Sequence, residues 1–159
     1  MSSKHVMLTR EGRDRMCREL EVLKGEKRRA IARDLSSARA HGDLSENAEY
    51  DAAKEAQAMN EKKISELEDV LMRARIINHS EMSKDEVLIG AMVKIKDSKT
   101  GDLFDYMLVA EEESDFTLNK ISISSPVGKA LMGHKAGDVV EIQVPAGILE
   151  YKIESITRE

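Results

Sequence analysis

The positions of the two prolines constrain this chain more than any other feature of its sequence. Pro126 and Pro145 are the only prolines among 159 residues, so none interrupts the first 125. Proline breaks a helix because its ring clashes with the preceding turn and it has no N–H to donate. The first part of the chain can therefore form long helices, and a charged fraction of 35% favours solvated ones.

Two apolar stripes run along this proline-free stretch at alternating spacings of about three and four, the pattern of a two-helix coiled coil. Thr9 can cap the start of the first helix. The first stripe comprises Met16, Leu20, Leu23, Lys27, Ala30 and Leu35 or Ala38, and the second comprises Ala53, Asn60, Ile64, Leu67, Leu71 and Ala74.

Gly42 is the only helix breaker between the two stripes, and Asp43, Leu44 and Ser45 follow it. A glycine followed by Asp and Ser is typical of one helix ending and another beginning. The sequence therefore predicts an antiparallel helical hairpin with its tip at residues 41–47. Arms of roughly 30 residues would extend about 45 Å at 1.5 Å per residue.

Two acidic residues, Asp43 and Glu46, lie in this tip, within the stretch HGDLSENAEY. Their spacing of three fits a helix cap, with Asp at the N-cap and Glu at the third helical position. It also fits a pair of carboxylates that bind a divalent cation. Mg²⁺ requires about six oxygen ligands, so two exposed carboxylates could only complete a site supplied mainly by another molecule. A two-metal phosphoryl-transfer centre is the natural example.

Basic residues lie beside the tip, on both predicted arms. They form either an ordinary solvated helix face or a strip that contacts nucleic-acid phosphates. Tyr50 is expected to pack between the helix ends, and the single Cys17 to be a buried, inert thiol. The basic residues are Lys24, Lys27, Arg28, Arg29, Arg33, Arg39 and Lys54.

From about Val87 the pattern changes to short alternating segments, which indicates strands. Pro126–Met132 is expected to form a short helix that Gly133 ends. The sequence thus predicts an α+β protein with a hairpin domain at 1–79 and, at 80–159, a small domain with a mainly antiparallel sheet. The expected strands are Ala91–Asp97, Leu103–Val109, a segment around Ile121 and Ile123, Val139–Val144 and Leu149–Ile156.

Charge is distributed unevenly between the two halves. Residues 1–80 carry 16 Lys and Arg against 15 Asp and Glu, whereas residues 81–159 carry 9 against 15. The acidic second half argues against free nucleic acid as its main partner and favours a protein surface. No apolar run approaches the length of a membrane span and no signal-peptide pattern begins the chain, so we expect a cytoplasmic protein.

Three stretches together resemble the Gre family of bacterial transcript cleavage factors. They are LTREG at residues 8–12, ARAHGDLSENAEYDAAKEAQ at 38–57 and ISISSPVGKALMGHKAGD at 121–138. The resemblance covers nearly the whole chain in the same order. The chain departs from the family's common ARExGD string at Ala40, where that string has an acid.

The resemblance implies a function that neither the composition nor the spacing establishes. Family members bind bacterial RNA polymerase through an FKBP-like C-terminal domain and insert the coiled coil into its secondary channel. The family's two tip acids correspond to Asp43 and Glu46, which would hold the second Mg²⁺ jointly with the polymerase and position a water. Arg39 and Lys54 would contact the backtracked RNA, whose 3′ end the polymerase itself then cleaves.

Contacts with the polymerase are expected within the Ser124–Leu131 segment, through Ser124, Ser125, Pro126 and Leu131. Two other functions remain open. One is a channel-binding regulator that inhibits polymerase without stimulating cleavage. The other is a structural adaptor whose hairpin dimerises, although the narrow stripe looks satisfied by the opposite arm and predicts a monomer.

Overall fold

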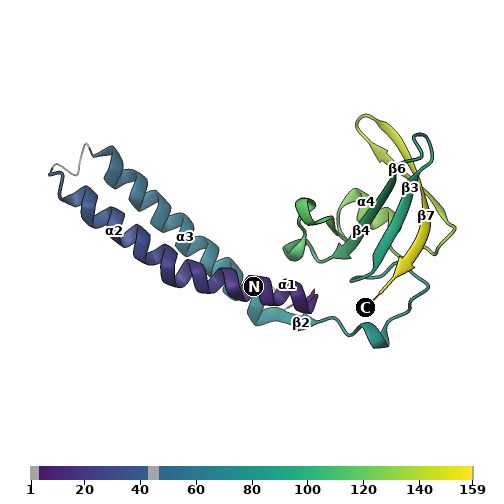
Figure 1. Ribbon diagram of the computed structural model, residues 1–159, viewed down its shortest axis with the longest axis horizontal. Helices are drawn as coiled ribbons and strands as arrows, with labels where there is room; N and C mark the ends of the chain where they lie inside the picture. Colours follow the sequence, from purple (N-terminus) through teal and green to yellow (C-terminus); the bar gives the residue numbers. More distant parts are fainter. Residues whose placement is uncertain (1–3, 43–46, 159) are drawn as a thin grey trace. The chain divides into compact units, whose positions relative to one another are not determined.

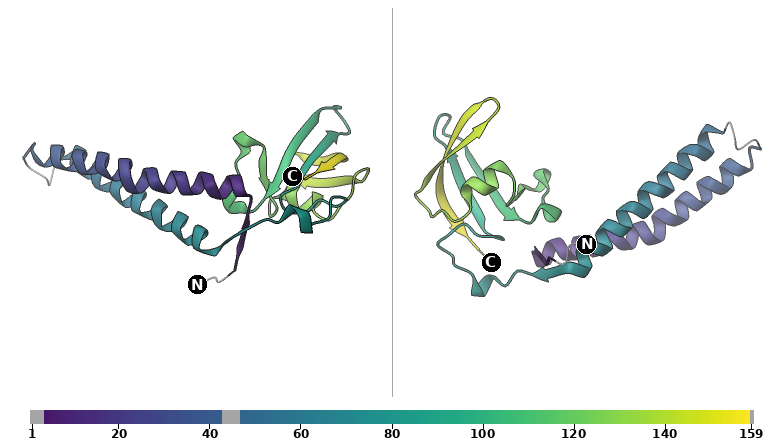
Figure 2. Two further views of the ribbon diagram at one scale, coloured as in Figure 1. Left: turned by 60° about the horizontal axis from the view of Figure 1, so that its bottom comes forward. Right: turned by 180° about the vertical axis from the view of Figure 1, so that it is seen from behind.

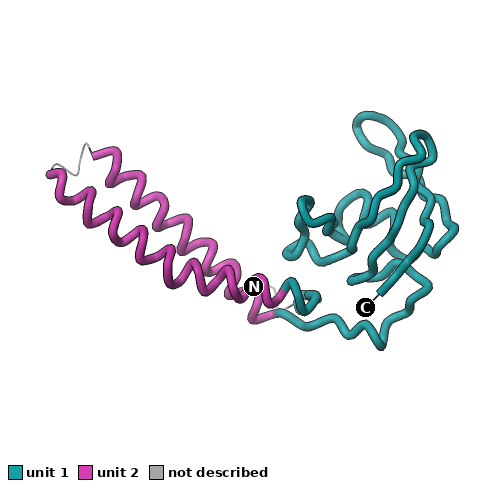
Figure 3. The backbone as a smooth tube through the Cα atoms, in the orientation of Figure 1, with its two compact units in different colours: residues 1–12, 74–159 teal, residues 13–73 magenta. Residues whose placement is uncertain are grey.

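The computed structural model describes residues 4–42 and 47–158 (Figure 1). It contains two compact units. One unit is formed by residues 13–73, and the other by residues 1–12 together with 74–159 (Figure 3).

The first unit is the predicted helical hairpin. Helix α1 (Arg10–Val22) continues through a π-helical turn (Leu23–Lys27) into α2 (Arg28–Arg39), and α3 (Ala48–Arg73) returns beside them (Figure 2). The facing side chains are buried because the two amphipathic helices cover each other's apolar stripe. The buried residues are Ile31, Leu35, Ala38, Ala53, Asn60, Ile64 and Leu67.

The first stripe differs from its prediction at Lys27 and Ala30, whereas Leu35 and Ala38 are buried as predicted. Lys27 is exposed and Ala30 only half-buried, whereas Ile31 is buried. Leu23 and Ile31 lie eight positions apart, one more than a heptad. A π turn is wider than an α turn and accommodates one additional residue. The π turn therefore shifts the inward-facing positions by one and directs Ile31 and Leu35 toward α3.

Two short strands at the base of the hairpin escaped prediction. β1 (Val6–Leu8) pairs in parallel with β2 (Ala74–Ile76), with Val6 opposite Ala74 and Leu8 opposite Ile76. Thr9 follows β1 and caps α1 as predicted, since its Oγ1 accepts a hydrogen bond from Gly12 N at 3.0 Å. The strand pair thus brings together the two ends of the helical segment.

The second unit contains a five-stranded sheet in the order β5-β4-β3-β7-β6. Only β4 and β5 are parallel, so the prediction of a mainly antiparallel sheet with a short helix is confirmed. A buried cluster that includes Val93, Ile95, Leu108, Leu131 and Ile153 forms the core. The elements are β3 (Met92–Asp97), β4 (Leu103–Val109), β5 (Lys120–Ser122), α4 (Pro126–Leu131), β6 (Val139–Val144) and β7 (Gly147–Thr157).

Cys17 contradicts its prediction, because its side chain is exposed on α1. The helical periodicity buries its neighbour Met16 and turns position 17 to solvent. Among the helices in residues 4–42 and 47–158, none combines the length and apolar character that crossing a membrane requires.

Candidate functional site

The two tip acids, Asp43 and Glu46, lie outside the described residues. The structure does define both sides of the tip. Helix α2 ends at Arg39 and α3 begins at Ala48. Gly42 has φ +99°, a left-handed conformation that glycine adopts without a side-chain penalty. This agrees with the prediction that glycine terminates the first arm.

Asn47 connects the two arms at the tip. Its Nδ2 donates to the carbonyl oxygen of Ala38 at 2.6 Å, and its Oδ1 accepts from Tyr50 N at 3.1 Å. The second bond is the N-cap interaction of α3. Helix α3 therefore takes its N-cap from Asn47, the residue directly before its first position, Ala48. Sequence reasoning overlooked Asn47, although Asn directly before a helix is a known cap signal.

The predicted RNA-contacting residues lie on different arms and have different partners. The Arg39 guanidinium carbon lies 6.0 Å from the centre of the Tyr50 ring, a cation–π arrangement. Lys54 Nζ donates to Gln57 Oε1 at 3.2 Å. Both basic side chains are exposed. Tyr50 packs against the cluster of Ile31, Leu35 and Ala53, which confirms its predicted role.

Other carboxylates near the tip do not assemble a metal site. His41 Nε2 lies 3.7 Å from Glu49 Oε2, with both side chains largely exposed. Within residues 4–42 and 47–158, no three His, Cys, Asp or Glu side chains group closely enough to hold a metal ion.

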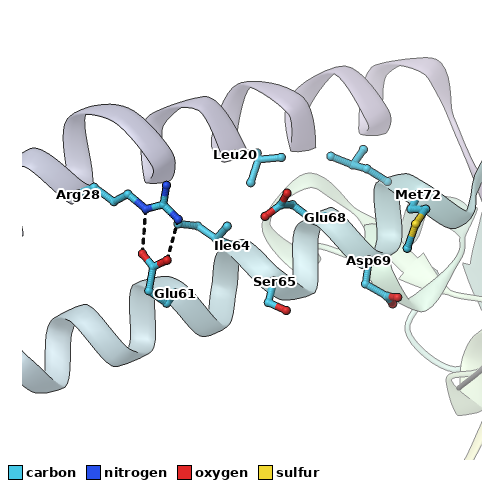
Figure 4. Close-up of a pocket in the computed structure, with 9 residues that line it drawn as sticks. Leu20, Arg28, Glu61, Ile64, Ser65, Glu68, Asp69 and Met72 are labelled. Carbon is cyan, nitrogen blue, oxygen red and sulfur yellow. Dashed lines mark hydrogen bonds and ion pairs between the residues drawn. The ribbon is translucent and has the colours of Figure 1, made fainter.

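An open groove of about 840 Å³ lies farther along the hairpin (Figure 4). Its charged groups are engaged with one another. Arg28 Nη2 and Nε donate to the two carboxylate oxygens of Glu61 at 2.6 and 2.9 Å, which lowers the pKa of Glu61. Asp69 likewise accepts from Arg73. This groove has the features of a hairpin surface stabilised by ion pairs, and the tip remains the candidate site.

The predicted polymerase-binding segment forms a compact turn before and within α4. Ser125 Oγ accepts from Gly128 N at 3.1 Å and donates to Ser122 O at 2.6 Å, so it caps α4 and ties it to β5. Ser124 and Pro126 are exposed. Leu131 is fully buried in the core, so its side chain is not on the surface where a contact with the polymerase was expected.

Two exposed apolar side chains precede the same segment and were not singled out from the sequence. Phe116 is 79% exposed and Leu118 is 48% exposed, in the turn between β4 and β5. Glu111 and Glu112 nearby in the sequence are also exposed. A large aromatic residue that directly follows a run of acidic residues is the sequence signal that could have identified this position.

Glu113 is a second residue that sequence reasoning overlooked. Its carboxylate accepts hydrogen bonds from Thr9 N at 2.8 Å and from Thr9 Oγ1, and it lies 3.3 Å from Lys120 Nζ. A Cβ on Gly12 would lie 2.2 Å from the carboxyl carbon of Glu113, so any larger residue there would displace this carboxylate from Thr9. The LTREG stretch is thus the docking point of a buried carboxylate that lies more than 100 positions away.

Comparison with known proteins assigns both parts of the chain. Residues 6–76 match the family described as transcription elongation factor, N-terminal, and residues 82–158 match the C-terminal GreA/GreB family. Transcription elongation factor GreA of Amoebophilus asiaticus is 49% identical over 149 residues, 94% of this chain and 95% of the relative. GreA of Chlorobium phaeobacteroides is 47% identical over 156 residues, 97% of this chain and 98% of the relative.

Among solved structures, GreA factor homolog 1 of Thermus thermophilus is 32% identical. The match covers 97% of this chain and 99% of that chain, with a TM-score of 0.45. The two family matches and the near-full-length identity to GreA proteins lead to one assignment: this chain belongs to the GreA/GreB family of transcription elongation factors.

Proposed function

We propose that this protein stimulates RNA polymerase to cleave the 3′ end of backtracked RNA and thereby rescues stalled transcription complexes. Its membership of the GreA/GreB family supports this function. The observation that carries it is an acidic tip, with Asp43 and Glu46 between two long helices, beside described residues that form no metal site of their own. The protein acts as a cofactor, and the polymerase performs the reaction.

The role of Asp43 and Glu46 follows from the chemistry of their donor atoms. Two carboxylates supply part of the six-oxygen shell that Mg²⁺ requires, and the polymerase supplies the rest. When bound in such a shared site, Mg²⁺ would supply stabilisation of the negative charge on the phosphodiester oxygens. A carboxylate of the tip also accepts a hydrogen bond from a water and orients it for attack.

Arg39 and Lys54 contact phosphates of the RNA. Both are exposed, and they project from opposite arms beside the tip. Stacking on Tyr50 leaves the charge of Arg39 intact while it restricts the side chain's freedom, which reduces the entropy lost on binding. The Gln57 contact does the same for Lys54.

Docking on the polymerase falls to the domain at 80–159, while the arm at 1–79 enters the secondary channel. Ser124, Ser125 and Pro126 present the contact surface, and buried Leu131 holds it in place. The net negative charge of this half suits a basic protein surface. The protein works as a monomer in the cytoplasm.

The decisive test measures release of labelled RNA from a backtracked bacterial polymerase in Mg²⁺. We expect Asp43→Asn and Glu46→Gln each to lower the stimulated rate by at least 100-fold, the scale seen when a charge-stabilising group is removed from a reaction centre. Binding to the polymerase should change little, since both variants keep the size of the side chain.

Asp51→Asn is the matched control, because Asp51 is an exposed acid on the first turn of α3. It should cleave at the wild-type rate. Full activity of the two tip variants would refute the proposed roles of the acids. Binding of the wild-type protein without any acceleration would instead indicate a channel-binding inhibitor.

A further inference from the structure

The π-helical turn at Leu23–Lys27 determines which face of α2 meets α3. One residue corresponds to a rotation of about 100° in an α-helix. With the additional residue absorbed in the turn, Ile31, Leu35 and Ala38 face α3. Without it, the inward positions would be Ala30, Asp34 and Ser37, as the heptad count had predicted for Ala30. The placement of the turn therefore sets the rotation of the distal part of the arm.

Asn60 on α3 lies opposite this turn. Its side chain is 5% exposed, and its Nδ2 donates to the carbonyl oxygen of Leu23, the first residue of the π turn, at 3.0 Å. Its Oδ1 is buried without a hydrogen-bond partner in the described structure. Asn60 occupies a position in the apolar stripe between Ala53 and Ile64, where apolar residues would normally lie.

A buried amide in this position costs stability, because an unpaired polar atom loses its hydration. An aliphatic side chain would bury apolar surface instead. A single polar residue in a coiled-coil core is known to specify alignment at the expense of stability. The hydrogen bond from Asn60 to Leu23 O can specify the alignment of the two arms, since its acceptor is a carbonyl at one end of the π turn.

The ion pairs on the hairpin surface do not specify the position of the π turn. Arg28 pairs with Glu61, the residue after Asn60 (Figure 4). Lys24 Nζ lies 3.8 Å from Glu68. Both pairs are about half-exposed, and their long side chains can follow a displaced backbone at little cost. The Asn60 bond differs from these pairs in two respects: the residue that donates it is nearly fully buried, and its acceptor is a backbone carbonyl of the turn itself.

We propose that Asn60 is a positioning residue that holds the π turn at Leu23–Lys27. By doing so it fixes the rotation of Arg28–Arg39 about the helix axis. That helix ends at Arg39, shortly before the tip in the sequence, so the rotation of the described end of the first arm depends on Asn60. The effect on RNA cleavage rests on the function proposed above, whereas the effect on the arm does not.

Asn60→Leu separates this role from stability. The variant replaces a partly unpaired amide with an aliphatic side chain of similar size, so we expect a Tm equal to or above that of the wild type. The π turn, no longer held at one place, can shift along the arm. We expect the maximal cleavage rate at saturating factor to fall at least threefold, with the half-saturating concentration unchanged.

Deletion of Gly25 provides a compensating change. It removes the additional residue, and Leu23 and Ile31 then lie one heptad apart. A Cβ at Gly25 would meet only Arg29 side-chain atoms at 3.6 Å or more, so no close packing depends on this glycine. In the double variant, a continuous α-helix needs no π turn to be held. We expect its cleavage rate to return to within twofold of the wild type.

Distances between spin labels test the arm directly. Cys17 is first replaced by Ser, and labels are attached to cysteines at Ala32 and Ala58, exposed positions on α2 and α3. We expect one narrow distance distribution with Asn60, a broadened or split one in Asn60→Leu, and a narrow one again after Gly25 is deleted. Ile64→Val, a loss of one methyl group from the same stripe, should lower Tm while the distribution stays narrow.

An unchanged, narrow distribution in Asn60→Leu would overturn the proposal, whatever the cleavage rate. A lower rate that deletion of Gly25 fails to restore would also overturn it, because a general packing defect would then explain the loss. If the distances change as expected while even the wild-type protein fails to stimulate cleavage, the proposed function is wrong and the role of Asn60 in the arm stands.

Discussion

Glu113 shows how a single residue can connect distant parts of this chain. Its side chain is 1% exposed, and that of its ion-pair partner Lys120 is 6% exposed. Both oxygens accept hydrogen bonds from Thr9, which itself caps α1. A buried ion pair contributes little net stability, but removal of one partner leaves the other charge uncompensated. The carboxylate is therefore required because Thr9 would lose its hydrogen-bond acceptor and Lys120 its buried ion-pair partner.

We predict that Glu113→Gln lowers the free energy of unfolding by about 3 kcal/mol, the low end of the cost of breaking a buried ion pair, because among the described residues Lys120 keeps only the exposed carboxylate of Glu11 at 3.9 Å. Glutamine keeps the size and one acceptor, so the change isolates the charge. Calorimetry should show a lower Tm. Glu112→Gln, one position earlier and exposed, should leave Tm unchanged. Equal Tm values for both variants would show that Lys120 is stabilised in some other way.

The turn that precedes β6 illustrates stabilisation within a single element. Asp138 Oδ2 accepts from Lys135 N at 2.9 Å and lies 3.2 Å from His134 Nδ1. The hydrogen bond from the Lys135 amide, followed by the interaction with His134, lowers the pKa of Asp138 below its ordinary value of 3.8. The ionised form therefore stabilises the turn from which β6 departs.

This lowered pKa gives a pH dependence with a definite sign. Because the pKa of Asp138 is lower in the folded protein, the stabilisation is complete above the ordinary carboxyl pKa of 3.8 and is lost as pH falls through the folded value. We predict that Asp138→Asn lowers Tm at pH 7 and that its difference from the wild type shrinks at pH 2 to 3. Asp105→Asn, an exposed acid on β4, is the control. A difference that persists in acid would exclude ionisation as the cause.

At the scale of the whole molecule, the apolar stripe of the described hairpin is covered by the opposite arm and is not available to a second copy. The hairpin stripe is buried between its own arms, including Ile31, Ile64 and Leu67. Large apolar side chains that remain exposed on the hairpin, Val22, Met59 and Met72, are scattered single positions. Isolated apolar residues of this kind are normal on protein surfaces.

We predict a monomer in sedimentation experiments, with a mass near 17.8 kDa. Because Cys17 is exposed, the measurement needs a reductant or the Cys17→Ser variant to prevent disulfide-linked dimers. A dimer that persists in Cys17→Ser would support the adaptor function, in which the hairpin associates with a second copy.

The regular spacing of apolar residues along the sequence was sufficient to predict most helices and strands. Alternation located β3, β4, β6 and β7, and Pro126 with Gly133 located α4. The weaker predictions failed for physical reasons. β1 and β2 have three residues each, too few for an alternating pattern to be recognised in the sequence. They are stabilised by pairing with each other, across a long separation in the chain. Asn47 was overlooked as the cap because the tip acids were expected to begin the second helix, whereas α3 begins at Ala48 and Asn47 also contacts Ala38 on the opposite arm.

By itself, the sequence determined the helical hairpin, the mainly antiparallel sheet and the presence of two acids between the arms. These follow from local rules: proline placement, apolar spacing and turn residues act over a few positions. Only the tertiary structure decided that Ile31 and not Ala30 faces α3, that Asn60 contacts the π turn, and that Glu113 reaches Thr9. These contacts join residues 37 and 104 positions apart, and no local pattern encodes a partner at that distance.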